Sequence, residues 1–119
     1  MEFNQYNTTV QQWIHTVLEN RETNADVVLE CCRDIIAYGR KTDDPKLMGF
    51  GFFYGGEIYY ELNDGAHFFH MMTEALTYLD RAEEWELVVR CYNFLGIASM
   101  SRGNPSLALD YYMNGLKDS

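Results

Sequence analysis

Basic residues are scarce in this chain, and their scarcity excludes one class of partner. The 119 residues include nine Lys and Arg against 18 Asp and Glu, so the formal net charge is −9. A nucleic-acid binder needs a basic stripe that displaces counterions from phosphates, and this sequence has none. An acidic surface also disfavours anionic membranes. We therefore expect no nucleic-acid and no membrane partner, and we favour a basic, neutral or apolar one.

Long apolar runs and a disulfide framework are also missing. No stretch approaches the roughly 18 apolar residues of a membrane-spanning helix, and the polar start, residues 1–7, does not resemble a signal peptide. The three cysteines, Cys31, Cys32 and Cys91, are an odd number with two adjacent, so paired disulfides are not expected. Buried thiols in a cytoplasmic protein are the favoured interpretation.

The residues that are present predict an all-α domain. Hydrophobic residues make up 47% of the chain and aromatic residues 15%, which suffices for the core of one domain. Apolar residues recur at spacings of three and four, the period of a helix face. Short polar breaks divide the chain into six such segments, so neighbouring helices are expected to be antiparallel. We predict three helical hairpins, approximately at residues 8–40, 45–80 and 83–118.

Helix starts are indicated by capping residues. The only two prolines follow Asp44 and Asn104, and a capping residue before proline is typical of a helix start. Asp64 precedes the fourth helix. Other starts are expected at Thr8 or Thr9, which can form capping boxes with Gln11 or Gln12, at Thr23, and at Asp80 with Glu83.

The chain also repeats itself at an interval of forty residues. Phe52 falls on Tyr92 and Gly56 on Gly96. A period of this size predicts stacked hairpins, none of which can bury its apolar face alone. The other coincidences are Leu47 with Leu87, Asp64 with Asn104, Met72 with Tyr112, Ala75 with Gly115 and Leu76 with Leu116.

The last repeat resembles the tetratricopeptide repeat, which has a bulky residue, Leu-Gly, and then small and aromatic residues on the second helix. The matching residues are Tyr92, Leu95-Gly96, Ala108, Tyr112 and Gly115. The resemblance is strongest over residues 89–117. The middle repeat is about six residues longer than the usual 34. It implies one domain over residues 1–119, a right-handed superhelix of about three antiparallel hairpins, and a protein-binding module without catalysis or cofactor.

In that family the first helix of each hairpin lines a concave groove for a peptide or partner segment. By the register of the repeat, the same role is expected for the first helix of the middle hairpin and for the first helix of the last hairpin. An aromatic and acidic groove of this kind favours a ligand with apolar and basic side chains. The alternative is that the aromatic residues pack against the next hairpin or against a further domain. The predicted groove residues are Phe50, Phe53, Glu57, Tyr60, Glu61, Arg90, Asn93, Ile97 and Ser101.

In one segment the local sequence favours β-structure rather than a helix. Residues 50–62 contain two aromatic runs around Gly55-Gly56, which is typical of a β-hairpin. The forty-residue match continues through this segment, so we predict a helix held by packing. A close neighbouring backbone would explain its glycines.

No residue pattern indicates an enzyme or a metal centre. His67 and His70 are spaced as metal ligands can be, but only Glu74 lies near them, and a surface pair is the favoured interpretation. Adjacent Cys31 and Cys32 cannot face the same side of a helix. The glutamates near residue 85 match the positive end of a helix dipole. Phosphate loops, nucleophile elbows and zinc spacings are absent.

The last helix carries an apolar side without an evident polar capping helix. We expect Leu109, Tyr112, Met113 and Leu116 to form an exposed end-face, to be covered by further chain or by a second copy in a homodimer. The last repeat is also similar to repeats at the N-terminus of bacterial signalling proteins such as diguanylate cyclases. The alternative function is therefore a regulatory or dimerisation region of a larger signalling protein.

Overall fold

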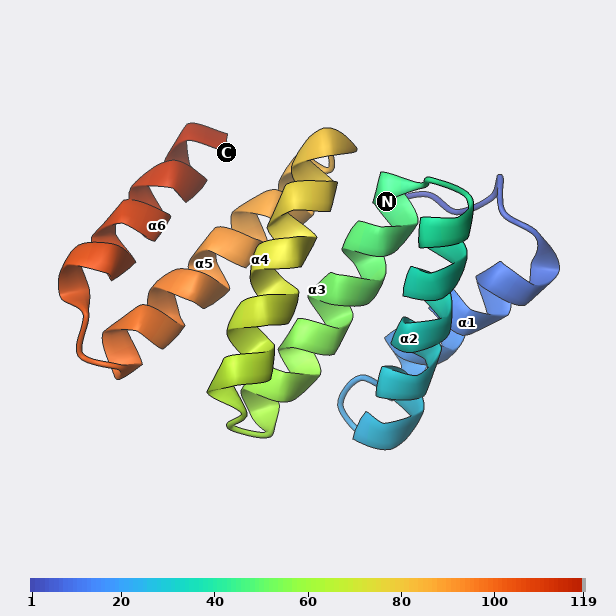
Figure 1. The fold of residues 1–119 in the computed structure, drawn as a ribbon, viewed down its shortest axis with the longest axis horizontal. Helices are drawn as coiled ribbons and strands as arrows, with labels where there is room; N and C mark the ends of the chain where they lie inside the picture. Colours follow the sequence, from blue (N-terminus) through green and yellow to red (C-terminus); the bar gives the residue numbers. More distant parts are fainter. Residues whose placement is uncertain (119) are drawn as a thin grey trace.

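The computed structural model describes residues 1–118, which form six α-helices. This part of the chain contains no β-strand, so the predicted all-α class is confirmed. In Figure 1 the helices follow one another in chain order along the longest axis, with the first and last at opposite ends. The helices are α1 (Thr8–Asn20), α2 (Ala25–Lys41), α3 (Pro45–Glu61), α4 (Gly65–Arg81), α5 (Trp85–Ser101) and α6 (Pro105–Asp118).

The helices form three hairpins, α1–α2, α3–α4 and α5–α6. Each helix packs against the next one in sequence, and the hairpins stack side by side over a length of 43 Å. The expected hairpins at 8–40, 45–80 and 83–118 agree with the observed bounds to within two residues. The helical-repeat arrangement is thus confirmed, while the right-handed superhelix stays a prediction.

Four consecutive turns share one geometry at intervals of 20 residues. Asp43, Asn63, Glu83 and Gly103 have positive φ values of 51°, 58°, 57° and 77°. In each turn the next residue donates its N–H to a carbonyl five residues earlier, at 2.8 to 3.0 Å. This is the Schellman ending, which satisfies the last carbonyls of a helix. Helices α2 to α5 each contain 17 residues, so the forty-residue repeat consists of two steps of helix plus three-residue turn.

Three of the predicted helix caps are confirmed. The side chains of Asp44, Asp64 and Asn104 each accept a hydrogen bond from the backbone N–H three residues later, at 3.2 Å. In α1 and α2 the capping side chains are instead Asn7 and Asn24. The expected caps at Thr8 or Thr9 and at Thr23 are therefore displaced, because an asparagine carbonyl oxygen caps as well as a hydroxyl.

The predicted cap of the fifth helix is wrong. Asp80 is still part of α4, and Glu83 is the left-handed residue of the turn. Helix α5 begins at Trp85, and Glu84 before it forms no side-chain capping bond. The repeated turn geometry, rather than a capping carboxylate, determines where α5 starts.

Segment 50–62 is helical in α3 rather than a β-hairpin, and burial accounts for this. Every residue from Leu47 to Ile58 is buried, because α2 and α4 pack on this helix. A Cβ at Gly51 would lie 3.1 Å from the carbonyl oxygen of Cys32, so the predicted close backbone approach is confirmed.

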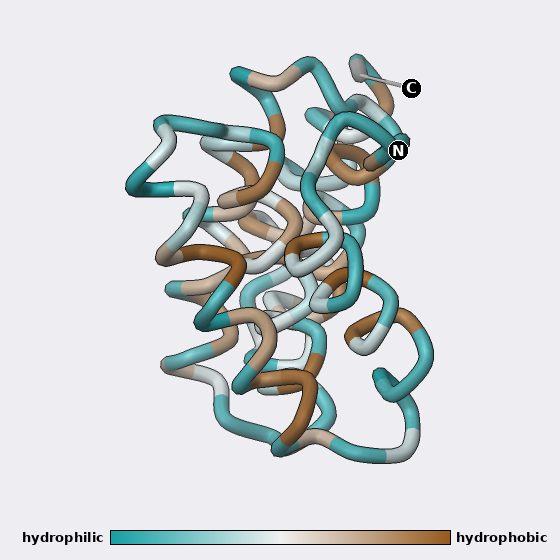
Figure 2. The backbone as a smooth tube through the Cα atoms, turned by 90° about the vertical axis from the view of Figure 1, so that its right-hand side faces the viewer, coloured by the Kyte–Doolittle hydropathy of each residue, from teal (hydrophilic) through white to brown (hydrophobic). Residues whose placement is uncertain are grey.

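Small residues also let α5 and α6 nest. A Cβ at Gly96 would lie 2.7 Å from the ring of Tyr112, and Ala108 on the facing helix is 1% exposed. Figure 2 shows short hydrophobic stretches alternating with hydrophilic ones along the backbone, as expected for helices with one buried side. The hairpins therefore share one continuous core.

Candidate functional site

The predicted groove residues all lie on α3 and α5, but they do not form one open surface. Phe50 and Phe53 are 1% and 0% exposed. The ring of Phe50 packs against Phe3 and Tyr54, with centroids 5.2 and 4.6 Å apart. For these two aromatic residues the structure shows packing inside the domain, so neither offers a surface to a ligand.

Glu57 is also withdrawn from the surface, because two arginines hold it. Arg21, the residue that ends α1, donates from Nε and Nη2 to the two carboxylate oxygens at 2.8 and 2.6 Å. Arg90 on α5 donates to the second oxygen at 3.4 Å. Glu57 is 8% exposed. A carboxylate with two cationic partners is neutralised, so Glu57 is not available to recognise a basic ligand.

Aromatic rings complete this arrangement. The guanidinium of Arg21 lies 5.1 Å from the ring centroid of Tyr54, and that of Arg90 lies 4.8 Å from the centroid of Phe53. The hydrogen bond with Glu57 raises the pKa of Arg21 above its usual value. Both guanidinium groups are therefore held in place, and that of Arg90 lies between Glu57 and Phe53 although the side chain is about one-third exposed.

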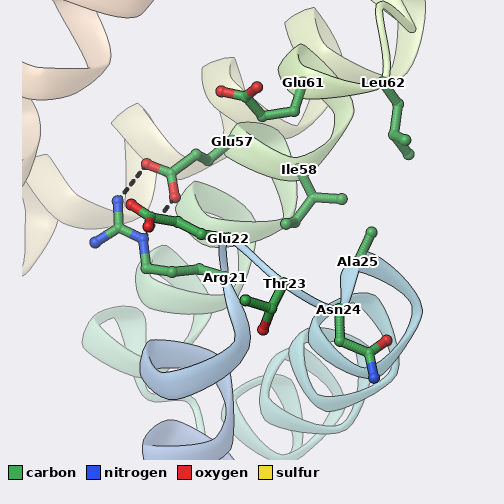
Figure 3. A pocket seen from close by; sticks show the side chains of 9 residues that line it. All are labelled: Arg21, Glu22, Thr23, Asn24, Ala25, Glu57, Ile58, Glu61 and Leu62. Carbon is green, nitrogen blue, oxygen red and sulfur yellow. Dashed lines mark hydrogen bonds and ion pairs between the residues drawn. The ribbon is translucent and has the colours of Figure 1, made fainter.

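Beside this network lies a cleft of about 520 Å³. Its walls are the turn between α1 and α2 and the last part of α3, as Figure 3 shows. Glu22 and Glu61 line the cleft and form no ion pair among the described residues. The cleft residues are Arg21, Glu22, Thr23, Asn24, Ala25, Glu57, Ile58, Glu61 and Leu62.

A second cleft of about 500 Å³ occupies the equivalent place one repeat later. It lies between the α3–α4 turn and the end of α5, and it contains Tyr60, Glu61 and Ser101 from the predicted groove. Seven of the nine positions of the first cleft recur in it after a shift of forty residues. These seven are Glu61, Asn63, Asp64, Gly65, Ala98, Ser101 and Arg102.

Glu61 lines both clefts and is therefore the residue at which they meet. In the second cleft the guanidinium of Arg102 lies 4.6 Å from the ring of Phe69. The ring of Tyr60 packs against Phe68 and Phe94, each at 5.4 Å. The second cleft thus combines aromatic walls with carboxylates, whereas the large apolar residues of the first cleft are the aliphatic Ile58 and Leu62.

The remaining predicted residues lie outside the clefts. Asn93 is exposed on α5, and Ile97 is 43% exposed there. The sequence interpretation missed Arg21 and Arg102, because both follow the last helical residue and belong to no helix face. The only signal for them was the forty-residue shift, which places Arg102 on Leu62 and Arg21 on Glu61.

His67, Cys32 and Cys91 have surroundings that fit a structural role. His67 Nδ1 lies 2.8 Å from Asp64 Oδ2, and its ring stacks on Tyr59 at 4.7 Å. Burial raises the pKa of Cys91 to about 12 and raises that of Cys32 well above its usual value. Low-pKa thiolates are the reactive form of cysteine, so these two thiols are suited to packing.

The described residues offer neither a metal-binding cluster nor a membrane-spanning helix. Residues 1–118 contain no group of three or more His, Cys, Asp or Glu side chains placed to hold a metal ion. Within the same residues no helix is both long enough and apolar enough to cross a bilayer.

Comparison of the chain with protein-family models, with curated proteins and with solved structures gave no match.

Proposed function

We propose that the domain is a protein-interaction module that binds an extended peptide segment across the two clefts, and that it catalyses no reaction. The observation that carries the proposal is the repeat relation of the clefts, which meet at Glu61. A stack of hairpins that presents equivalent clefts in a row suits a ligand that is itself a regular chain. The resemblance to tetratricopeptide repeats, whose ligands lie along the stack, supports the same function.

The chemistry of the clefts favours a segment with basic and apolar side chains. Glu22 and Glu61 are exposed carboxylates, whereas Glu57 is neutralised by Arg21 and Arg90. The uncommitted charge in the clefts is thus mainly negative, in keeping with the net charge of −9. Aromatic and aliphatic walls provide contact for apolar side chains.

The stacking distance sets an expected spacing in the ligand. Side chains of α3 contact those of α5 directly, as in the pair Tyr60 and Phe94. Packed helices lie about 8–10 Å apart, and an extended chain advances about 3.3 Å per residue. Side chains about three residues apart in the peptide would therefore enter successive clefts.

A library of fluorescent ten-residue peptides tests the proposal by anisotropy. We expect enrichment of sequences with Lys or Arg about three residues from a large apolar residue. Glu61→Gln should weaken the best binders about two- to fivefold, the effect of one exposed charge contact. Raising the salt concentration should reduce the loss of affinity that Glu61→Gln causes, because added ions screen the charge contact.

Glu30→Gln is the matched control, because Glu30 is an exposed glutamate on α2 and lines neither cleft. It should leave the affinities unchanged. A library without enrichment, or binding that Glu61→Gln and Glu30→Gln affect equally, contradicts the proposal.

A further inference from the structure

The last hairpin exposes more apolar surface than any other described part of the molecule. Ile97 and Met100 on α5 are 43% and 55% exposed, and Leu109 and Met113 on α6 are 60% and 53% exposed. Leu107 and Leu116 are also exposed. We call Ile97, Met100, Leu109 and Met113 the end-face. The expected exposure is confirmed for Leu109, Met113 and Leu116. It is wrong for Tyr112, which is half-buried because its ring packs against Gly96 of α5. An apolar patch of this kind marks an interaction surface.

The end-face corresponds to the surface of the middle hairpin against which the last hairpin packs. On the middle hairpin, Phe53, Tyr60 and Phe69 receive Phe94 and Arg102 of the last hairpin. Forty residues after these three receiving positions stand Asn93, Met100 and Leu109. Met100 and Leu109 of the end-face therefore stand in the same register as the occupied stacking surface of the middle hairpin.

The other end of the stack does not offer a matching surface. Most exposed residues of α1 are polar, including Gln11, Gln12, His15 and Glu19. Leu18 is the only large apolar residue exposed on this helix, at 40%. Stacking the end of one copy on the beginning of another would place apolar side chains against polar ones, which leaves buried polar groups unsatisfied.

The net charge also differs between the last hairpin and the rest of the molecule. The helices α5 and α6 and the turn between them contain three acidic residues and three basic ones, so residues 85–118 carry no net charge. The whole net charge of −9 thus lies in residues 1–84. Net electrostatic repulsion between two copies therefore does not oppose contact through their neutral, apolar ends.

We infer that two copies of this chain associate through their end-faces, α6 against α6, in a closed dimer with two-fold symmetry. The same surface on both partners is the arrangement of an isologous interface. The end of the molecule measures 28 × 21 Å, so complete contact buries on the order of 1,000 Å² in total, near the lower limit of specific interfaces. Dissociation in the micromolar range is therefore expected. This inference does not depend on the clefts, which lie at the hairpin turns.

Sedimentation equilibrium of the full chain from about 1 to 500 µM tests the inference. We expect the mass to rise from 13.9 kDa to twice that value and to stop there. Leu109→Glu and Met113→Glu should each raise the dissociation constant at least about 100-fold, since a symmetric dimer buries the new carboxylate twice. Leu18→Glu, the matched control on α1, should leave it unchanged.

Three results would overturn the inference. They are a mass that stays at one chain at all concentrations, a mass that grows beyond two chains as head-to-tail stacking would give, and a dimer that both end-face variants leave intact. Because the substituted side chains are exposed, the variants should keep the thermal unfolding midpoint of the monomer, which circular dichroism checks.

Discussion

Glu57 shows how much one side chain can connect in a stacked fold. Among the described residues it is the only buried residue with an ionisable carboxylate or cationic group. Its partners come from the end of α1 and from α5, so one carboxylate on α3 joins all three hairpins. A buried charge is tolerated only when paired, and here both oxygens are satisfied.

Removing that charge should therefore cost more than removing an exposed one. Glu57→Gln leaves Arg21 and Arg90 without a counter-ion, and we expect a loss of about 1–2 kcal/mol in the free energy of unfolding. The value is moderate because both arginines are about one-third exposed. Urea denaturation measures the loss, and Glu30→Gln should stay within about 0.5 kcal/mol of the unchanged chain. Equal effects of the two substitutions would mean that the network contributes nothing.

The left-handed turn residues offer a second comparison between single positions. Glu83 and Gly103 occupy equivalent turns with φ values of 57° and 77°. A side chain in this conformation costs about 1 kcal/mol relative to glycine. Glu83→Gly should therefore stabilise the domain by about 1 kcal/mol, and Gly103→Ala should destabilise it by a similar amount.

No steric contact complicates the second substitution, because a Cβ at Gly103 would meet no atom within 4 Å. Thermal unfolding followed by circular dichroism measures both changes. A stabilising Gly103→Ala would show that the backbone relaxes out of the left-handed region.

At the scale of an element, α3 is the helix whose environment overrides its sequence. Two of its glycines distinguish packing from propensity. A Cβ at Gly51 would lie 2.6 Å from Cγ1 of Ile36 and 3.1 Å from the carbonyl oxygen of Cys32. A Cβ at Gly55 would meet only the terminal methyl group of Met71 at 2.5 Å, with the next atom at 3.9 Å.

These surroundings predict opposite results for the same substitution in one helix. Gly51→Ala should destabilise the domain by about 1–2 kcal/mol, because overpacking exceeds the gain in helix propensity. Gly55→Ala should be neutral or stabilising by up to about 1 kcal/mol, because the flexible Met71 side chain can move. Chemical denaturation of both variants checks the prediction, and a stabilising Gly51→Ala would contradict the close approach of α2.

The same helix shows what the sequence could and could not predict. The forty-residue repeat correctly outweighed the local β-hairpin pattern of residues 50–62. It could not show that Phe50 and Phe53 are buried, because that depends on Phe3 and Phe94, which lie far away in sequence. Nor could it reveal the pairing of Arg21 with Glu57, since turn residues follow no helical period. The clefts depend on such turn residues, and the sequence predicted only part of their lining, namely Glu57, Tyr60, Glu61 and Ser101.

At the scale of the whole molecule, stability should vary along the stack. Helices in a repeat array contact mainly their neighbours, so each hairpin depends on the ones beside it. Helix α3 lies between α2 and α4, whereas α1 and α6 each pack against one neighbouring helix. Local opening at an end breaks one helix interface, while opening of α3 breaks its interfaces with α2 and α4 and its side-chain contacts with α5.

Amide hydrogen exchange followed by mass spectrometry should therefore show slowest exchange in α3 and faster exchange in α1 and α6. The expected order opposes intrinsic propensity, since α3 contains four glycines within Gly49–Gly56. Measured at about 1 µM, where the chain is monomeric, α6 should exchange faster than α3 by at least about tenfold, equivalent to 1.4 kcal/mol of opening free energy. At several hundred micromolar the exchange of α6, and of the end-face segment of α5, should slow, because a second copy covers the end-face. Uniform exchange across the six helices would show that the domain opens as one unit, and the nearest-neighbour description of the stack would then be wrong.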